Sequence, residues 1–411
     1  MEVGIALERA QQILLDLVSA QGETKVSLFE ATGRVLSQDI QAGENIPAFD
    51  RSPLDGYAMR AEDIVTASQN NPVHLTVIEE IAAGHIAQKA LSAGTTIKVM
   101  TGAPIPVGAD VVIKWEDVER IDQEIKVTQS LKSDSNIVPE GEDVKKGELI
   151  AARGTRITPP VLGLIASLGI QQVPVFTKVK IAIISTGDEL LDPSEEKRPG
   201  KIYNSNLYTF QAHCLELGME PIPLGIVMDN QEAIAEKISQ GLEVADVVIT
   251  TGGVSVGDYD LVQDAVNDIG ADTLFWKVAM KPGSAMVAAV KDNKPIMGLS
   301  GNPASSLVAF DLLVAPMLKK MQGLEKQLPS VISAVLSDGF GKSSPQRRFL
   351  RGSLHNQGGM DTVKFTGAQA NGVLKSMVGC NVLVHVPAGS GKLAAGEQVS
   401  AYVIGRIDDT Y

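Results

Sequence analysis

The chain has 411 residues, of which 44% are hydrophobic and 21% are charged. This length predicts several domains of ~100–200 residues each, and this balance is typical of globular proteins, which excludes a chain that is disordered, collagen-like or a coiled coil as a whole. With 36 basic and 49 acidic side chains the formal charge is −13, which argues against nucleic acid or an anionic membrane as the main partner.

The N-terminal stretch begins Met-Glu and carries mixed charge, so it lacks the basic start and apolar centre of a signal peptide. No apolar run approaches the ~20 residues that a membrane span needs. The two cysteines, Cys214 and Cys380, lie far apart in the sequence, which makes a disulfide framework or a zinc ribbon improbable and favours a reducing compartment. We therefore expect a cytoplasmic protein.

The first half of the chain predicts a helix, a linker domain and an inserted β domain. Apolar residues at helical spacing indicate one amphipathic helix over residues 5–20. Residues 46–144 are rich in glycine, proline and valine, with short apolar runs, and predict a mostly β domain. We expect residues 1–45 and 145–177 to form one N-terminal helix and linker domain, which the chain leaves and re-enters.

The second half predicts an α/β domain and a small β domain. Residues 178–326 alternate continuous apolar strands with helical patterns near 205–217, 231–243, 258–269 and 303–321, which predicts a doubly wound parallel α/β sheet. Residues 327–411 contain short β-like runs and predict a C-terminal β barrel or sandwich.

Four loops of the α/β segment follow predicted strands and have unusual polar content. They read STGDEL at 185–190, TTGGVSVGDYD at 250–260, KVAMKPG at 277–283 and GLSGNPASS at 298–306. In the last loop we expect Asn302 as the N-cap, Pro303 as the first helical residue and free amides from Ala304 to Ser306. Because ligands of such sheets bind at the carboxyl ends of the strands, the four loops are expected to converge.

Carboxylates, lysines and glycine-rich turns at one sheet edge indicate a phosphate-bearing ligand with Mg²⁺. Asp229, at the end of another predicted strand, adds a carboxylate to this edge. Taken singly, each acid could instead cap a helix and each glycine could simply make a turn. Neither G-x-G-x-x-G nor G-x-x-x-x-G-K-[ST] is present, which counts against a dinucleotide oxidoreductase and a P-loop NTPase.

The inserted β domain and its connector also carry polar motifs. Asp55 lies in DGYA and Thr101 in MTGAP, whereas Asp143 lies in GED at the domain junction. Asp55 and Gly56 fit a tight hairpin turn equally well, and the GED segment fits a solvated connector. The five histidines are scattered along the chain, so a histidine metal cluster is improbable.

Taken in chain order, these motifs resemble the MoeA family of molybdopterin molybdenumtransferases, which includes the carboxyl-terminal part of gephyrin. The resemblance extends over nearly the full length. It implies an elongated homodimer of four-domain subunits in which the MogA-like α/β domain of one subunit faces the β domain of the other. The implied reaction is the Mg²⁺-dependent insertion of molybdate into adenylyl-molybdopterin with release of AMP. A MogA-like adenylyltransferase and molybdopterin synthase are the implied partners.

The resemblance also implies roles for individual residues. The implied catalytic residues are Asp55, Thr101, Asp143, Glu189, Lys277 and Lys281. The implied substrate-binding residues are Gly252, Gly253, Ser255, Pro303, Ser305, Arg351 and Ser376. The implied ligands of Mg²⁺ are Glu189, Asp229 and Asp260.

The sequence departs from the family pattern at several positions. Ser284 replaces the second lysine of KPGK, Ser300 replaces a proline, Asn204 replaces an aspartate, and the segment around Val138 lacks the arginines of the family. These changes leave open a weakened paralogue that binds the pterin nucleotide as a chaperone or scaffold. The resemblance of the α/β domain to the MogA type leaves open a second alternative, the related adenylyltransferase step. The sequence does not distinguish molybdate from tungstate.

Overall fold

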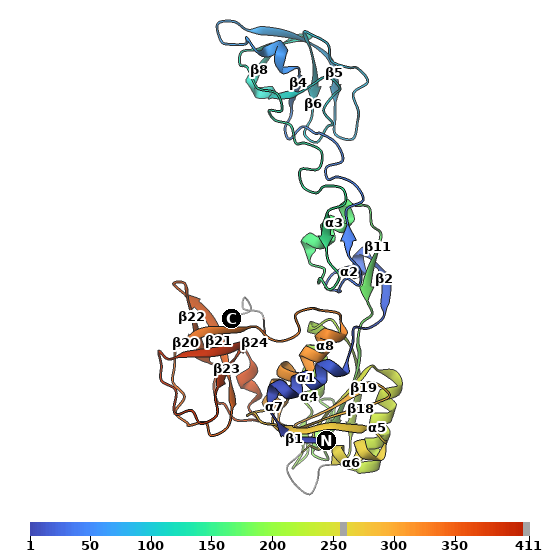
Figure 1. Cartoon of the computed structure of the whole chain (residues 1–411), viewed down its shortest axis with the longest axis vertical. Helices are drawn as coiled ribbons and strands as arrows, with labels where there is room; N and C mark the ends of the chain where they lie inside the picture. The colour runs from blue at the N-terminus through green and yellow to red at the C-terminus, as the bar shows by residue number, and fades with distance from the viewer. Residues whose placement is uncertain (255–260, 406–411) are drawn as a thin grey trace.

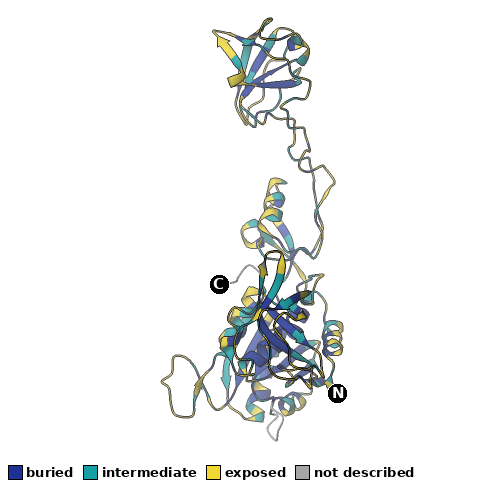
Figure 2. Cartoon of the chain, turned by 90° about the vertical axis from the view of Figure 1, so that its left-hand side faces the viewer, coloured by how far each residue is buried: buried dark blue, intermediate teal, exposed yellow. Residues whose placement is uncertain are grey.

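The computed structural model of the chain is elongated, with a β domain at one end and two domains packed together at the other (Figure 1). It describes residues 1–254 and 261–405. Buried residues gather inside the domains, and Phe349 and Leu383 of the C-terminal domain share one hydrophobic core with the α/β domain. The two segments that connect the inserted β domain are largely exposed or half-buried (Figure 2). Within the described ranges, none of the helices has the length and apolar character needed to cross a membrane.

The α/β domain is built on a seven-stranded sheet with the order β1-β17-β18-β19-β16-β12-β15. Its strands are β1 (Glu2–Ile5), β12 (Lys180–Thr186), β15 (Glu220–Val227), β16 (Val247–Thr251), β17 (Asp272–Val278), β18 (Met286–Lys291) and β19 (Lys294–Leu299). The central strands β12 and β16 are buried on both faces, which explains why they read as continuous apolar runs.

Helices cover both faces of this sheet, so the predicted doubly wound α/β fold is confirmed. The helices α5 (Gln231–Val244) and α6 (Leu261–Asp268) pack on one face. The opposite face is covered by α1 (Leu7–Leu17), α4 (Asn206–Glu216), α7 (Pro303–Ala309) and α8 (Ala315–Met321). Both layers are therefore hydrophobic, as this architecture requires.

One strand of the sheet, β18, was not expected from the sequence. It runs antiparallel to both of its neighbours, β17 and β19, whereas the other pairs are parallel. Asp292 and Asn293, which join β18 to β19, both have positive φ angles of 50° and 62°. Two positive φ angles in succession are the signature of a type I′ hairpin turn, and this turn reverses the chain within the sheet.

The N-terminal strand and helix contact the α/β domain, although the sequence led us to group them with the linker. β1 pairs in parallel with β17, and α1 packs against α8. The physical reason is that α1 buries Leu7, Ala10 and Leu14, and the larger domain offers an apolar surface to cover them. The division into four domains remains a prediction, but β1 and α1 pack with the α/β domain and not with the linker.

A small linker module joins the two ends of the molecule. β2 (Glu23–Ser27) pairs with β11 (Gln172–Phe176), and β3 (Ile40–Gln41) pairs with β10 (Leu149–Ala151), both antiparallel. The short helices α2 (Leu28–Ala31) and α3 (Pro159–Ser167) complete it. Segments that are far apart in the sequence thus lie side by side, because the β domain is inserted between them.

The two remaining domains consist mainly of β-strands. The inserted domain is a six-stranded sheet formed by β4 (Gly56–Met59), β5 (Val73–Ile81), β6 (Thr95–Val99), β7 (Val111–Lys114), β8 (Val118–Ile121) and β9 (Glu124–Val127). The C-terminal domain is a closed barrel, as predicted, of β20 (Val331–Leu336), β21 (Arg348–Gln357), β22 (Met360–Phe365), β23 (Val382–Val386) and β24 (Gln398–Val403).

Candidate active site

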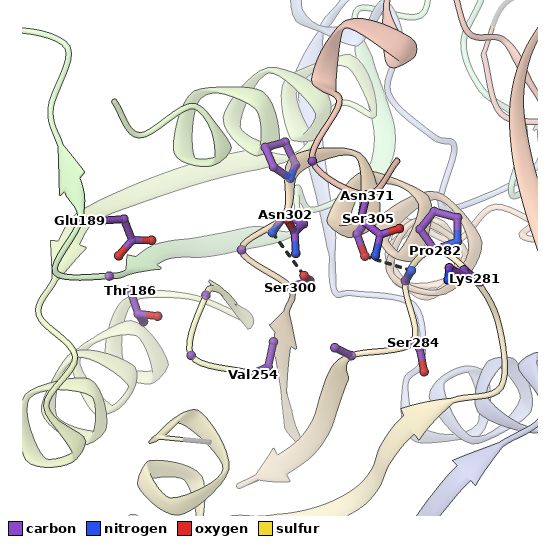
Figure 3. A pocket seen from close by; sticks show the side chains of 18 of the residues that line it. Thr186, Glu189, Val254, Lys281, Pro282, Ser284, Ser300, Asn302, Ser305 and Asn371 are labelled. Atoms are coloured by element: carbon purple, nitrogen blue, oxygen red, sulfur yellow. Dashed lines mark hydrogen bonds between the residues drawn. The ribbon is translucent and has the colours of Figure 1, made fainter. Parts of the chain in front are cut away.

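A pocket of about 790 Å³ lies at the carboxyl ends of β12, β16 and β19, next to the start of α7 (Figure 3). All four polar loops predicted from the sequence contribute to its lining, together with the loop that follows β15. Two segments that flank strands of the C-terminal barrel also contribute to the lining, through Gln346 and through Asn371 and Gly372. Its polar lining residues are Thr186, Glu189, Asp229, Lys281, Ser284, Ser300, Asn302, Ser305, Gln346 and Asn371.

One end of the pocket is acidic, because it carries the side chains of Glu189 and Asp229. The backbone N–H of Asp229 donates to Oδ1 of Asp188 (3.1 Å), and the N–H of Asp188 donates to Oδ2 of Asp229 (3.4 Å), which ties the two loops together. Glu189 folds back over Gly187, so that a Cβ at Gly187 would lie 2.6 Å from Glu189 Oε2. The φ angle of Gly187 is 152°, a conformation that other residues rarely adopt, which favours glycine at this turn.

The other end of the pocket is cationic and carries Lys281; Figure 3 shows Glu189 and Lys281 on opposite sides. The backbone of Lys281 is fixed on both sides, since its N–H donates to the carbonyl of Arg347 (2.9 Å) and its carbonyl accepts from the N–H of Phe349 (2.8 Å). Its side chain is exposed to the pocket solvent. The ammonium group is therefore available to an anion.

The start of α7 forms the floor between the two ends. Asn302 is the N-cap and Pro303 the first helical residue, as predicted. The expectation of free amides was wrong for two residues, because the N–H of Ser305 donates to the carbonyl of Asn371 (3.1 Å) and that of Ser306 donates to the carbonyl of Asn302 (3.0 Å). The Oγ of Ser305 accepts from the N–H of Gly283 (3.0 Å), so Ser305 links the helix to the lysine loop.

Arg351 and Ser376 lie beside the pocket without belonging to its lining. The fully buried Arg351 donates from Nε to Oγ of Ser376 (3.0 Å) and from Nη2 to the carbonyls of Ala370 (3.0 Å) and Ala368 (3.2 Å). It thereby holds the segment that precedes Asn371. Its buried Nη1 has no hydrogen-bond partner among the described residues. Burial lowers the pKa of the guanidinium.

The remaining predicted residues divide into three groups. Gly252 and Gly253 line the pocket, as do Pro303 and Ser305. Ser255 and Asp260 lie outside the described residues. Lys277 is not part of the lining, and its Nζ lies 3.6 Å from the centroid of the Trp276 ring.

Asp55 directly precedes β4 and Thr101 follows β6, in the inserted β domain at the other end of the molecule from the α/β domain (Figure 1), whereas Asp143 lies in the connector between β9 and β10. Oδ1 of Asp55 accepts from both the N–H and the Oγ1 of Thr101, each at 2.7 Å. These two bonds, the backbone one first, lower the pKa of Asp55. Asp143 is exposed, and its N–H donates to the carbonyl of Ile46 (3.0 Å).

The oxygen donors at the acidic end suit a hard divalent cation. Two carboxylates and a threonine hydroxyl line this end, and Mg²⁺ prefers a small number of carboxylates together with water and phosphate oxygens. Within residues 1–254 and 261–405 no group of three acidic, histidine or cysteine side chains is placed to hold a metal ion by itself. The donor set therefore fits a cation shared with a phosphate ligand.

Sequence reasoning missed the contribution of the C-terminal part of the chain. Gln346 and Asn371 bring side-chain amides to the pocket from loops that flank the barrel strands. Neither residue lies in a motif with local meaning, and only the packing of the barrel against the α/β domain brings them there. Thr186 was part of a recognised loop, but its hydroxyl was not assigned a role.

Three family models together match most of the chain. Residues 5–169 match a family model described as the MoeA N-terminal region (domain I and II). Residues 182–320 match the probable molybdopterin binding domain, and residues 333–404 match the MoeA C-terminal region (domain IV).

Individual relatives are similar over nearly their full length. A molybdopterin molybdenumtransferase of Bacillus subtilis (strain 168) is 39% identical over 389 residues, covering 93% of this chain and 90% of the relative. One from Staphylococcus aureus (strain Mu50) is 34% identical, covering 96% and 94%. The crystal structure of a molybdopterin biosynthesis MoeA protein from Pyrococcus horikoshii superimposes with a TM-score of 0.84 at 32% identity, covering 98% of this chain and 99% of that one. This chain belongs to the MoeA family.

Proposed function

We propose that the chain is a molybdopterin molybdenumtransferase that inserts molybdate into adenylyl-molybdopterin and releases AMP, in molybdenum cofactor biosynthesis in the cytoplasm. The observation that carries this proposal is a single pocket with two carboxylates at one end and a lysine at the other. Family membership and the names of the relatives support the choice of substrates.

At the acidic end, Glu189 and Asp229, with Asp260 from the neighbouring loop, would hold Mg²⁺ against the diphosphate of the pterin nucleotide. When bound, Mg²⁺ offsets the charge of the phosphates and polarises the phosphoanhydride bond that breaks. Gly252 and Gly253 leave room for the diphosphate, since both have positive φ angles and no side chain.

At the cationic end, Lys281 would bind the oxygens of molybdate. Molybdate is a dianion, so its site needs positive charge and neutral donors, and the hydroxyls of Ser284 and Ser305 are nearby in the lining. We propose that this end is supported by Lys277, Arg351 and Ser376. Arg351 acts through the segment that it holds and through Nη1, for which the described part of the chain offers no hydrogen-bond partner.

We further propose that the working unit is a homodimer in which the β domain of one subunit completes the pocket of the other. Asp55, Thr101 and Asp143 then contribute to the site in trans. This proposal is supported by the shape of one chain, in which the inserted β domain and the α/β domain occupy opposite ends (Figure 1). A MogA-like adenylyltransferase would supply the nucleotide substrate, and molybdopterin synthase its precursor.

The test is an assay of AMP release from adenylyl-molybdopterin. Wild-type protein should release AMP only when molybdate and Mg²⁺ are both present, and release that is indifferent to molybdate would contradict the proposal. Lys281→Ala should lower kcat/KM by ~10²-fold, because its charge contacts the developing transition state. Lys277→Ala should cost less, because its ammonium already stacks on Trp276.

The second candidate is a paralogue that binds the pterin nucleotide without turnover. Ser284 motivates it, because a neutral side chain stands in the pocket lining only three residues after Lys281. Tight binding of adenylyl-molybdopterin without AMP release in the same assay would favour it. Consumption of ATP in the presence of molybdopterin would instead favour the adenylyltransferase step.

A further inference from the structure

The hydroxyl of Thr186 is a buried donor at the acidic end of the pocket that has no partner among the described residues. Thr186 is the last residue of β12, lines the pocket and is 3% exposed. Its Oγ1 makes no hydrogen bond within the described part of the chain. Buried hydroxyl groups almost always have a hydrogen-bond partner. Because the described part of this chain supplies none to Thr186, which lines the pocket, we expect the ligand to supply the acceptor.

The local structure explains why the chain itself supplies no acceptor. Successive residues of a strand point to opposite faces, and the preceding Ser185 is satisfied by Asn204 Oδ1 and Thr251 Oγ1, each at 3.2 Å. On the other side, Thr186 packs beneath the glycine turn, since a Cβ at Gly252 would lie 2.7 Å from its Oγ1 and one at Gly253 would lie 3.0 Å away. The glycines crowd the hydroxyl without offering it an acceptor.

Gly252 and Gly253 have positive φ angles, line the pocket and pack against the Thr186 hydroxyl. Because they have no side chains, they leave room for an anion next to this hydroxyl. The carboxylates of Glu189 and Asp229 repel an anion at this end, so a neutral donor is the group that can approach a phosphoryl oxygen there without a cation. Figure 3 shows Thr186 beside Glu189, with Val254 of the glycine loop on its other side.

We propose that the Thr186 hydroxyl donates a hydrogen bond to a phosphoryl oxygen of the diphosphate in adenylyl-molybdopterin, and is thus a further substrate-binding residue. This inference rests on the proposed function. It assigns the acidic end to the diphosphate on the evidence of a donor in this chain, independently of any metal ion.

The test compares Thr186→Val, which keeps the shape and removes the hydroxyl, with Thr186→Ser, which keeps the hydroxyl. The control is Thr250→Val. Thr250 lies on the neighbouring strand β16 and is fully buried, and its hydroxyl has no hydrogen-bond partner among the residues that the structure describes, but it does not line the pocket. All are made in the full-length chain. The readouts are the thermal midpoint and kcat/KM for AMP release.

We expect both valine variants to be as thermostable as the wild type or more so, because each removes an unpaired buried hydroxyl. Only Thr186→Val should lose activity, with kcat/KM reduced ~10- to 100-fold, mainly through KM, as for the loss of a hydrogen bond to a charged group. Thr186→Ser should stay within a few-fold of the wild type.

Wild-type kcat/KM in Thr186→Val would overturn the inference while leaving the proposed function intact. Equal losses of activity in Thr186→Val and Thr250→Val would also overturn it, since the effect would then be structural. Absence of AMP release from the wild-type protein would instead overturn the proposed function, and the inference with it.

Discussion

His213 forms a partly buried ion pair that is separate from the candidate active site. Its Nε2 lies 2.8 Å from Asp311 Oδ1 and its Nδ1 lies 3.5 Å from Glu216 Oε2. These three side chains line a second cavity, and Lys319 also lines it. Burial disfavours the charged imidazole, but the two carboxylates, Asp311 above all, outweigh it and raise the pKa of His213 to about 10. The imidazolium therefore persists at neutral pH.

This pair predicts a loss of stability on the alkaline side. A histidine whose folded pKa is raised contributes fully below its unfolded pKa of 6.5, and the contribution is lost as the pH rises through about 10. Between these values the thermal midpoint of the wild type should fall by several degrees more than that of His213→Gln. Thermal unfolding monitored by circular dichroism at both ends of the range measures the difference.

His385 provides the control, because burial, and secondarily Arg347, lower its pKa. A histidine with a lowered folded pKa costs stability as the pH falls below its unfolded pKa of 6.5 and not at higher pH. His385→Gln should therefore leave unchanged the fall of the thermal midpoint between pH 6.5 and about 10. Identical alkaline slopes in the wild type and His213→Gln would contradict the assignment of the pair.

For single residues, the sequence predicted which side chains meet in the pocket when those side chains directly follow a strand. It did not predict the pocket residues whose position depends on the three-dimensional packing. Glu189, Asp229 and Lys281 could be brought together because parallel strands end at one edge. Thr186 required knowledge of which strand-end hydroxyl lacks an acceptor, and Asn371 required the packing of another domain. Both depend on contacts between segments distant in sequence.

Among the elements, the segment 303–321 was expected to be one helix and is interrupted by a π-helical turn, η3 (Phe310–Val314), in which the N–H of Ala315 donates to the carbonyl of Phe310. Pro316 has no N–H, so it cannot donate to the carbonyl of Leu312 as a regular α-helix requires. The buried Gln11 of α1 supplies a donor instead, with its Nε2 at 2.8 Å from Leu312 O.

The hydrogen bond from Gln11 to the carbonyl of Leu312 predicts that an apolar residue of the same size at position 11 would destabilise the fold. Gln11→Met preserves volume but removes the donor to a buried carbonyl, which should cost about 1–3 kcal/mol. The thermal midpoint of the α/β domain should fall by several degrees. Gln12→Met is the matched control, because Gln12 is exposed and its side chain donates to Asp16 on the same helix; its effect should stay within about 0.5 kcal/mol. Equal midpoints for the two variants would contradict the role of Gln11.

The elements that the sequence predicted well are those with a strong period or an apolar run, such as β12 and α5. The hairpin strand β18 was missed because its turn residues, Asp292 and Asn293, were not recognised as a type I′ turn. The N-terminal helix was recognised, but its partner was not, since a helix's periodicity reveals that one face is buried without revealing against what.

The whole molecule separates residues that the proposed reaction needs together. Asp55 directly precedes β4, in the domain at one end of the molecule, whereas Glu189 lines the pocket beside α7 in the domain at the other end (Figure 1). This separation follows from the insertion of the β domain into the linker, which the composition of residues 46–144 predicted; the motifs alone do not show how far apart the two ends lie. Within one chain the pocket therefore has no access to Asp55, and the proposed homodimer resolves the difficulty by supplying that residue from the partner subunit.

This arrangement predicts complementation between two inactive variants. Asp55→Asn and Glu189→Gln should each lower AMP release by ~10²-fold or more. Co-expressed, half of the dimers are mixed, and each mixed dimer has one pocket with both residues intact, so activity should recover to about one quarter of the wild type. Glu189→Gln with Lys281→Ala is the control pair: both residues lie in the α/β domain, so every pocket keeps one defect and no recovery is expected. If light scattering shows mixed dimers but Asp55→Asn and Glu189→Gln do not recover activity, the site is not shared between subunits.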